Sequence, residues 1–360
     1  MKNNMMKKLL TMTLACAMTL SLAACGSKAE SPADSSADQN TAAPIETDTK
    51  AYKVAVIKQL DHASLDEIAN AVTAELDQIS ADKNVKIEYE VTSGQGDQTI
   101  LKQLSDQAIA DGVDAIIPIA TTAAQIAALS AEETKTPVVY AAVSDPETAK
   151  LTGIDYVTGT SDALNTNFIM DMMFAQNPNT AKVGLLYSLS EPNSAKPIAD
   201  AKAYLDTKGI EYVEQTANTN DEVVAAASAL IAAGVDAVFT PTDNVIMAAE
   251  LAIYEDLAKN GIPHYTGADS FALNGAFLGY GVDYANLGAE TANMVSGILL
   301  DGSKPSATPV LTFDNGTATI NTDICRELGL NYDELAETFA PLCTKVQSIV
   351  TAESFDDLNE

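Results

Sequence analysis

The sequence predicts an α/β fold made of two doubly wound lobes with a cleft between them. The first observation is an internal repeat, since GVDAIIPIATT at residues 112–122 returns as GVDAVFTPTDN at residues 234–244. Two more segments recur in the same order at a similar offset, KVAVIKQLDHAS as KVGLLYSLSEPNS and TPVVYAAVSDP as GIPHYTGADSF. The period is too long for a solenoid repeat, so it indicates two similar domains rather than a repeat array.

The second observation is that strand and helix patterns alternate in both halves. Short runs rich in β-branched residues predict buried strands at residues 54–57, 115–119 and 138–142. Helical patterns of ordinary length separate these runs. This alternation predicts βαβ units and a parallel sheet in each lobe.

The first helix is expected to begin at Ser64, because Ser64-Leu-Asp-Glu67 matches a capping box. Its apolar face contains Ile68, Val72, Leu76 and Ile79. The next helix, residues 98–111, places Ile100, Leu101, Leu104 and Ala108 on one face. In the second half we expect helices at residues 195–208, 221–233 and 244–260. Glycines that suit a left-handed helix end follow these helices, at positions 112, 209, 234 and 261.

The N-terminus resembles the export signal of a bacterial lipoprotein. Three lysines precede an apolar segment, residues 9–24, that is too short to remain as a membrane span. The segment ends in Leu22-Ala-Ala-Cys25, which predicts cleavage before Cys25 and a lipid on its thiol. The alternative is an ordinary secretory signal with a chance cysteine. Residues 26–50 are polar and predict a tether, so we expect the protein on the outer face of the bacterial cytoplasmic membrane.

Charge and cysteine content further narrow the functional class of the protein. The formal net charge is −30, and it becomes −33 without residues 1–24, which contain three lysines and no acidic residue. Such a surface argues against nucleic-acid binding, which needs clustered basic groups. Cys325 and Cys343 remain after export, and we expect a disulfide between them, the alternative being two buried thiols.

The sequence does not predict an enzyme. It has two histidines and no G-x-S-x-G nucleophile motif. The glycines of SGQGDQT at residues 93–99 lack the phosphate-loop pattern, and a strand-to-helix turn explains them better. No metal-ligand spacing is present, so we expect neither a metal nor a cofactor. A carboxylate-based surface hydrolase stays open as an alternative, because the chain has many acidic residues.

Polar residues follow the predicted strands, where parallel sheets bind ligands. In the first half Thr121 and Thr122 offer hydroxyls before the helix that starts at Ala123, whereas the second half has Asp243 and Asn244 in the same place. A zwitterion would suit this difference, with its carboxylate on the threonines and the N–H of Ala123 and its ammonium on Asp243 or Asp269. Ordinary helix capping is the alternative explanation for Thr122 and Asp243.

The full set of candidate ligand residues includes the other strand ends. Its members are Thr121, Thr122, Ala123, Ser144, Asp145, Asn193, Ser194, Asp243, Asn244, Asp269 and His62. Aromatic candidates near strand ends are His62, Tyr187, Phe271 and Tyr284, although a place in the core or at the rim explains each of them better than a ligand contact.

The chain resembles the substrate-binding lipoproteins of ABC transporters, of the tryptophan/tyrosine-binding type. The resemblance runs from about residue 53 to 331 and rests on VAVIKQLDHASLDEI, PVVYAAVSDP, KVGLLYSLSEPNS, FTPTDN and ATINTDICRELGL. It implies two Rossmann-like lobes of the periplasmic-binding type I fold, joined by hinge crossovers. It also implies an aromatic amino acid as ligand, and delivery to an ABC permease driven by a separate ATPase.

The expected domain limits follow from this arrangement. The first lobe takes residues 51–158 and about 284–310, the second takes 159–283 and about 311–345, and an acidic tail takes 346–360. Hinge crossings are expected near residues 158–162, 279–284 and 308–321. We expect a monomer. Four alternatives stay open: a ligand sensor for a signalling partner, a nucleoside or sugar receptor, the hydrolase, and an adhesin or structural lipoprotein.

Overall fold

The computed structural model describes residues 51–313 and 316–359. These residues belong to one compact unit, Thr49–Glu360. The predicted signal peptide, Cys25 and the tether lie outside the described residues.

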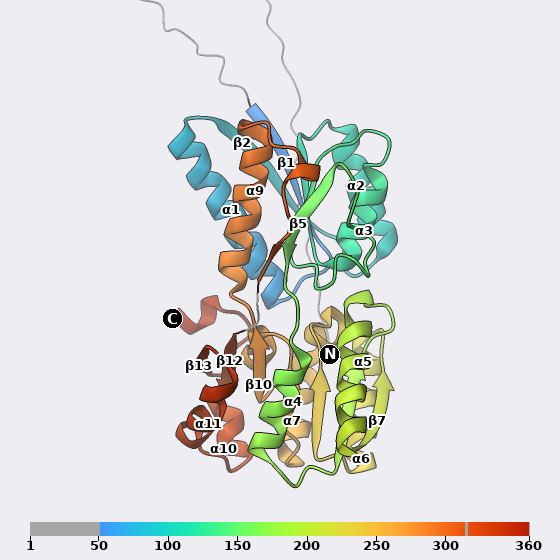
Figure 1. Cartoon of the computed structure of the whole chain (residues 1–360), viewed down its shortest axis with the longest axis vertical. Helices are drawn as coiled ribbons and strands as arrows, with labels where there is room; N and C mark the ends of the chain where they lie inside the picture. Colours follow the sequence, from blue (N-terminus) through green and yellow to red (C-terminus); the bar gives the residue numbers. More distant parts are fainter. Residues whose placement is uncertain (1–50, 314–315, 360) are drawn as a thin grey trace, which may run out of the picture. The chain divides into compact units, whose positions relative to one another are not determined.

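The first lobe is built on a six-stranded parallel sheet with the order β11-β5-β4-β3-β1-β2. Its strands are β1 (Ala51–Lys58), β2 (Lys86–Ser93), β3 (Ala115–Ile119), β4 (Val138–Tyr140), β5 (Val157–Ser161) and β11 (Leu311–Thr312). Its helices are α1 (Ala63–Lys83), α2 (Gln98–Ala110), α3 (Thr121–Ser130) and α9 (Tyr284–Leu300). Helices α1 and α9 cover one face of the sheet, and α2 and α3 cover the other (Figure 1).

The second lobe has a seven-stranded sheet with the order β13-β12-β10-β9-β8-β6-β7. Its strands are β6 (Lys182–Tyr187), β7 (Glu211–Thr216), β8 (Ala237–Thr240), β9 (His264–Thr266), β10 (Leu278–Gly281), β12 (Thr317–Asn321) and β13 (Lys345–Ile349). Its helices are α4 (Thr166–Gln176), α5 (Pro192–Lys208), α6 (Asn220–Ala233), α7 (Asn244–Lys259), α8 (Asp269–Leu273), α10 (Thr322–Glu327) and α11 (Tyr332–Phe339). All pairs are parallel except β10 with β12.

Successive apolar side chains along a strand point to opposite faces of the sheet, so each strand contributes to the core on both faces. In β1, Val54 and Val56 pack with α1 and α9, while Ala55 and Ile57 pack with α2 and α3. In β8, Val238 packs on the side of α6 and α7. Both faces are therefore apolar, as expected for parallel strands covered by helices. This confirms the predicted doubly wound lobes.

Two details of the predicted helices are wrong. Helix α1 begins at Ala63 with His62 as its N-cap, so Ser64 does not form a capping box. The Ser64 hydroxyl is instead hydrogen-bonded to the hydroxyl of Ser270 in the second lobe. In α2, Ile100 is 37% exposed although Leu101 is buried. The predicted glycine helix ends are confirmed, because the glycines at 112, 209, 234 and 261 all have a left-handed φ near +70°.

The predicted disulfide is also wrong, because Cys325 and Cys343 are both free thiols. Cys325 is buried in the apolar core of the second lobe, and burial raises its pKa to about 11. The Sγ of Cys343 donates to the carbonyl oxygen of Phe339 at 3.2 Å. Buried thiols with raised pKa values are poor nucleophiles, so both cysteines fit a packing role.

The chain passes between the two sheets three times. It leaves the first sheet after β5 and re-enters the first lobe between β10 and α9; the last passage lies between β11 and β12. The structure therefore keeps β5 and β11 in the first sheet, a few residues beyond the limits expected for that lobe. Residues expected in an acidic tail include strand β13, which pairs with β12.

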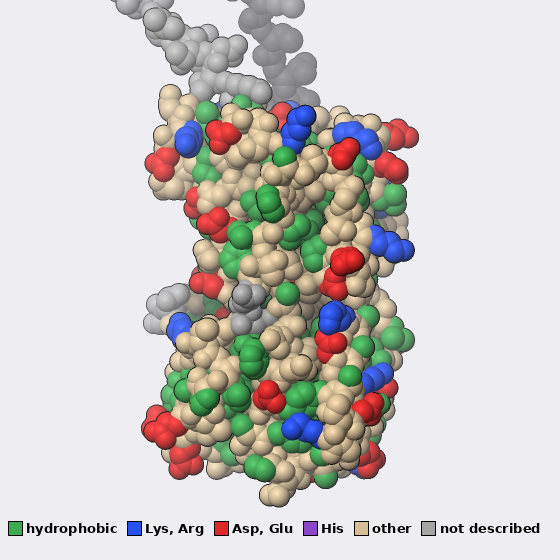
Figure 2. All heavy atoms as spheres, in the orientation of Figure 1, with side chains coloured by type: hydrophobic (Ala, Val, Ile, Leu, Met, Phe, Trp, Pro, Cys, Tyr) green, Lys and Arg blue, Asp and Glu red, His purple; other side chains and the backbone are tan. Residues whose placement is uncertain are grey.

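The surface carries charged side chains of both signs. Lysine and acidic side chains are interspersed on the face drawn in Figure 2, with apolar side chains scattered between them. Within the described ranges, no helix is both long and apolar enough to cross a membrane.

Candidate functional site

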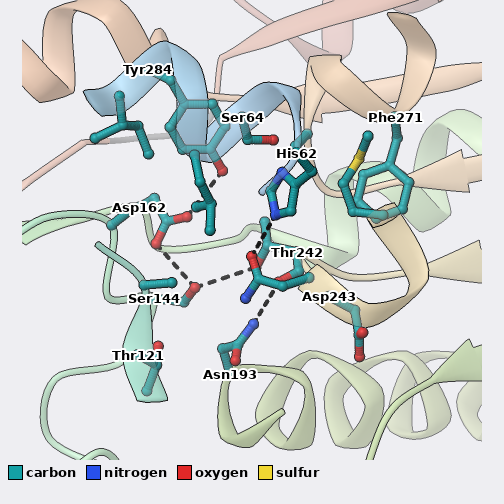
Figure 3. Close-up of a pocket in the computed structure, with 17 residues that line it drawn as sticks. His62, Ser64, Thr121, Ser144, Asp162, Asn193, Thr242, Asp243, Phe271 and Tyr284 are labelled. Atoms are coloured by element: carbon teal, nitrogen blue, oxygen red, sulfur yellow. Dashed lines mark hydrogen bonds between the residues drawn. The ribbon is translucent and has the colours of Figure 1, made fainter. Parts of the chain in front are cut away.

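A small cavity of about 20 Å³ lies where the carboxyl ends of the two sheets face each other (Figure 3). Its lining residues come from both lobes: His62, Ser64, Leu65, Ile68, Ala120, Thr121, Ala142, Ser144, Asp162, Asn193, Thr242, Asp243, Asn244, Met247, Ala268, Phe271 and Tyr284. Six of them lie within two residues of the carboxyl end of a strand, where the strand-end rule places ligand sites: Ala120, Thr121, Ala142, Asp162, Thr242 and Ala268.

The lining combines two kinds of side chain. Hydroxyl, amide and carboxyl groups follow β3, β4, β5 and β8, whereas apolar side chains come mainly from α1, α7 and α8. The apolar members are Leu65, Ile68, Met247 and Phe271, together with the ring of Tyr284. Such a cavity suits a ligand with a polar end and an apolar end.

The start of α3 presents hydrogen-bond donors to this cavity. The helix begins at Thr121, and the backbone of its N-cap, Ala120, has φ +79° and ψ 164°. Alanine rarely adopts such a φ, so the surrounding structure holds this turn in place. The Thr121 hydroxyl is buried without a hydrogen-bond partner, and the residue is 3% exposed. Together with free N–H groups of the first turn, it can bind an anion.

Thr122 faces a different environment from its neighbour. Its N–H donates to the side-chain oxygen of Gln59 at 3.1 Å. Thr122 lines a groove outside the cavity, with Gln59 and Glu191. Ala123 is buried in the apolar core between α3 and the sheet, and its side chain does not line the cavity.

Asp243 lines the cavity, but its carboxylate is fully used inside the second lobe. One oxygen accepts the N–H groups of Val245 and Ile246, both at 3.1 Å, and so caps α7. The other accepts the N–H of Ser188 and the hydroxyl of Ser194, both at 2.7 Å. Burial raises the pKa of Asp243 despite these bonds. The carboxylate therefore fixes the loops around the cavity.

Asp162 is the other carboxylate in the lining, and it lies where the chain leaves the first lobe. It accepts hydrogen bonds from the hydroxyls of Ser144 and Tyr284, both at 3.0 Å (Figure 3). Tyr284 begins α9, so this bond joins two of the passages between lobes. Asp162 is 4% exposed, and burial raises its pKa to about 6.

The lobes are held together by direct hydrogen bonds around the cavity. Gln59 Nε2 donates to Glu191 Oε1 at 2.5 Å. His62 Nε2 lies 3.0 Å from Asn244 Oδ1, and Ser144 Oγ lies 3.3 Å from Thr242 Oγ1. Ser64 and Ser270 form a fourth bridge. The structure is therefore a closed state of the two lobes.

A pair of acidic side chains lies beside the cavity. Burial, together with the negative charges of Asp269 and Asp283, raises the pKa of Glu67 to about 8. Burial raises the pKa of Asp269 to about 6. One carboxyl oxygen of each, Glu67 Oε2 and Asp269 Oδ1, is buried without a partner. Neither residue belongs to the cavity lining itself.

The structure brings six of the candidate ligand residues to the cavity: His62, Thr121, Ser144, Asn193, Asp243 and Asn244. Asn193 donates to the carbonyl oxygen of Thr242 and leaves its Oδ1 buried and unpartnered. The rest do not line the cavity. Asp145 accepts the N–H and the hydroxyl of Thr148, and Ser194 supports Asp243.

Of the aromatic candidates, His62, Phe271 and Tyr284 line the cavity. Tyr187 does not, because its hydroxyl donates to Glu214 on the neighbouring strand. Sequence reasoning missed Asp162, which it used only as a hinge position, and Gln59 and Glu191. Asp162 follows β5 directly, so the strand-end rule applied to every strand would have found it. In the described part of the chain, no cluster of three or more His, Cys, Asp or Glu side chains could hold a metal ion.

Comparison with known proteins finds matches along most of the folded chain. The family model described as ABC transporter substrate binding protein matches residues 53–340. A tyrosine-binding protein of Clostridioides difficile is 28% identical over 292 residues, which cover 79% of this chain and 83% of that protein.

Two solved structures are similar as well. A Streptococcus pneumoniae ABC domain in complex with L-Trp is 29% identical with a TM-score of 0.74, covering 82% of this chain and 100% of that one. A ligand-free, open substrate-binding protein with adhesive properties from Clostridium difficile is 25% identical with a TM-score of 0.61, covering 84% and 100%.

These matches extend over most of the folded chain, and the two-lobed architecture agrees with them. Proteins of this family act outside the cytoplasm and bind solutes rather than transform them. The chain belongs to the family of ABC transporter substrate-binding proteins.

Proposed function

We propose that this protein binds a free aromatic amino acid between its lobes and delivers it to an ABC permease driven by a separate ATPase. The observation that carries the proposal is the cavity itself, which has a polar side, an apolar side and walls from both lobes. The tyrosine-binding and tryptophan-bound relatives support the choice of ligand.

The ligand carboxylate would bind at the start of α3. The buried Thr121 hydroxyl has no protein partner, and the first-turn N–H groups carry the positive end of the helix dipole. The groups are already in place, so binding an anion needs no rearrangement of α3. Asn193 Oδ1 is an acceptor in the same lining and could receive one ammonium proton.

The ligand ammonium would bind near Asp162 rather than Asp243. All four donors to Asp243 come from the protein, so a ligand would have to displace one of them. Asp162 accepts hydrogen bonds from two side chains, Ser144 and Tyr284, and an ionised carboxylate offers about four acceptor positions. A bound ammonium would also offset the burial that raises the pKa of Asp162.

The ligand ring would pack among Leu65, Ile68, Met247 and Phe271. Because the lining comes from both lobes, a ligand gains all its contacts only when the lobes are closed. Binding therefore shifts the population from open to closed. The permease would then recognise the closed form.

Anchoring to the membrane would occur through a lipid on Cys25. We expect Cys25→Ala to move the protein from the membrane fraction to the soluble exported fraction, because the thiol that carries the lipid is lost. Cys16→Ala lies in the same apolar segment and should leave the protein in the membrane fraction. Retention of Cys25→Ala in the membrane fraction would contradict lipid anchoring.

Thermal unfolding of the Thr49–Glu360 unit against free amino acids, nucleosides and sugars tests the ligand class. A ligand at about a hundred times its Kd adds about 2.7 kcal/mol of stability, a shift of several degrees. We expect shifts with L-tryptophan, L-tyrosine or L-phenylalanine only. A shift with nucleosides or sugars in their place would replace the amino-acid proposal.

A further inference from the structure

His62 is the one side chain of the cavity whose hydrogen-bonding pattern can be deduced step by step from its neighbours. The backbone N–H of Thr122 can only donate, so the oxygen of the Gln59 amide faces it at 3.1 Å. The Gln59 nitrogen must then point to Glu191, where it donates to Oε1 at 2.5 Å. This chain fixes the first amide of the network.

The same reasoning extends to the imidazole ring. Asn244 Nδ2 donates to Glu191 Oε2 at 2.7 Å, and Asn244 Oδ1 faces His62. Burial and the charge of Asp243 raise the pKa of Glu191 to about 8, and this orientation of the amide belongs to the ionised carboxylate. Since Oδ1 can only accept, the His62 Nε2 at 3.0 Å carries the proton. The other ring nitrogen, Nδ1, is then an acceptor in the neutral ring. It is buried and has no partner in the protein.

The surroundings keep this ring neutral. Burial lowers the pKa of His62 to about 4, although the hydrogen bond with Asn244 raises it. At neutral pH the Nδ1 lone pair is therefore available to a donor. A buried acceptor without a partner costs free energy, which a donor on the ligand can recover.

The position of the ring indicates which donor. His62 lines the cavity and lies between Tyr284 and Phe271 in the view of Figure 3. Those two residues, with Leu65 and Ile68, form the apolar side, away from the α3 start where the ligand carboxylate is proposed. A donor near Nδ1 would thus belong to the ligand side chain rather than to its amino-acid head group.

We infer that His62 selects ligands whose aromatic ring carries a hydrogen-bond donor, an indole N–H or a phenol O–H, over ligands with a plain ring. This inference rests on the proposed amino-acid function and adds to it a residue that decides between aromatic side chains. A ligand without the donor leaves His62 Nδ1 buried and unpaired, and this selects against it. The penalty corresponds to a loss of affinity of about tenfold or more.

The test uses pairs of ligands that differ in the ring donor alone. L-tryptophan is compared with L-3-benzothienylalanine, in which sulfur replaces the indole N–H, and L-tyrosine is compared with L-phenylalanine. Calorimetric Kd values are measured for the full-length protein, for His62→Leu and for Gln59→Ala. In at least one pair we expect the wild-type protein to prefer the donor-bearing member about tenfold or more.

The two variants separate selection from closure. His62→Leu should reduce this preference to within about threefold, because the acceptor is gone. Gln59→Ala loses a bond between the lobes but keeps Asn244 and the proton on His62 Nε2, so both ligands should weaken by similar factors and the preference should remain. A wild-type preference near one in both pairs, or a preference that survives in His62→Leu, overturns the inference while amino-acid binding stands. No binding of any of the four ligands to the wild-type protein overturns the proposed function and this inference together.

Discussion

The hydroxyl of Thr121 is buried inside the cavity wall without a partner in the protein. Buried hydroxyls are nearly always hydrogen-bonded, so an unpartnered one in a cavity indicates a place for a ligand atom. The hydroxyl of Thr122 is also buried without a partner, but Thr122 lines the groove outside the cavity, so only Thr121 is placed to meet a ligand in the cavity.

Replacement of Thr121 by valine tests this role. The change keeps the shape of the side chain and removes the donor, so we expect the Kd for the amino-acid ligand to rise about tenfold or more. Thr121→Ser keeps the hydroxyl and should stay within about threefold of the wild-type Kd. Calorimetry on the two variants decides, and equal affinity of Thr121→Val and the wild-type protein would remove the hydroxyl from the site.

The raised pKa of Glu67 predicts how the stability of the folded protein depends on pH. Its pKa is raised in the folded protein to about 8, above the ordinary value of 4.5, by burial and then by the charges of Asp269 and Asp283. The folded state thus binds the proton more tightly than the unfolded state does. Its contribution to stability is largest below pH 4.5 and is lost as the pH rises through about 8.

Glu67→Gln cannot ionise, so the variant does not lose stability as the pH rises through the pKa of Glu67. We expect the variant to be more stable than the wild-type protein by roughly 2 kcal/mol at pH 8, with the gain shrinking to near zero at pH 4.5. Urea unfolding at several pH values measures the difference. Glu75→Gln on the same helix is the control and should show no such trend; a Glu67→Gln gain that does not change with pH would contradict the raised pKa.

At the scale of helices and strands, the starts of α3 and α7 occupy equivalent places in the two lobes and have diverged. The repeat predicted both, together with the polar residues at their ends. It could not predict that Asp243 is occupied by the protein, because two of its donors, Ser188 and Ser194, belong to a different segment of the chain. Helix propensity and capping patterns describe one segment of the chain. Whether all acceptor positions of a carboxylate are filled depends on donors that lie far apart in sequence.

The capping box of α1 failed for the same kind of reason. Ser64 has the right spacing to Glu67, yet its hydroxyl is hydrogen-bonded to Ser270 of the other lobe, and His62 takes the N-cap position. A long-range hydrogen bond replaced a local one. Apolar periodicity was more dependable, since Ile68, Val72 and Leu76 are all fully buried.

Asp243→Ala measures the structural role of this carboxylate. We expect a loss of about 3 kcal/mol in the free energy of unfolding, because the α7 cap is removed and buried donors lose their acceptor. Asp283→Ala is the matched control, since Asp283 is an exposed N-cap that accepts only the N–H of Asn286 among the bonds described. It should cost about 1 kcal/mol or less. Similar losses in both variants, measured by urea unfolding, would contradict the role given to Asp243.

At the scale of the whole molecule, closure depends on a small number of polar bridges between the lobes. Gln59 to Glu191 is a fully buried one, with both residues 3% exposed. The sequence pattern of one lobe does not predict such a pair, because the two residues meet only when the lobes close. Sequence reasoning therefore predicted the two lobes and their cleft but not the contacts that hold them together.

Gln59→Ala should weaken the closed state without altering ligand choice. We expect affinities for all aromatic ligands to fall by a similar factor of about three to thirty, since one buried hydrogen bond contributes roughly that much. Small-angle X-ray scattering with saturating ligand should still show compaction, at a higher ligand concentration. Gln78→Ala on the outer part of α1 should behave as wild type, and a selective loss of one ligand in Gln59→Ala would show that Gln59 touches the ligand instead.

The central claim is that one amino acid lies between the lobes with its carboxylate at α3 and its ammonium at Asp162. A crystal structure with L-tryptophan or L-tyrosine, whichever gives the larger thermal shift, tests it most directly. The account predicts ligand carboxylate oxygens within hydrogen-bond distance of the Thr121 hydroxyl, the ammonium beside Asp162, and the ring against Leu65, Ile68 and Phe271. A head group bound at Asp243 or Asp269, or a ligand outside this cavity, would contradict the account.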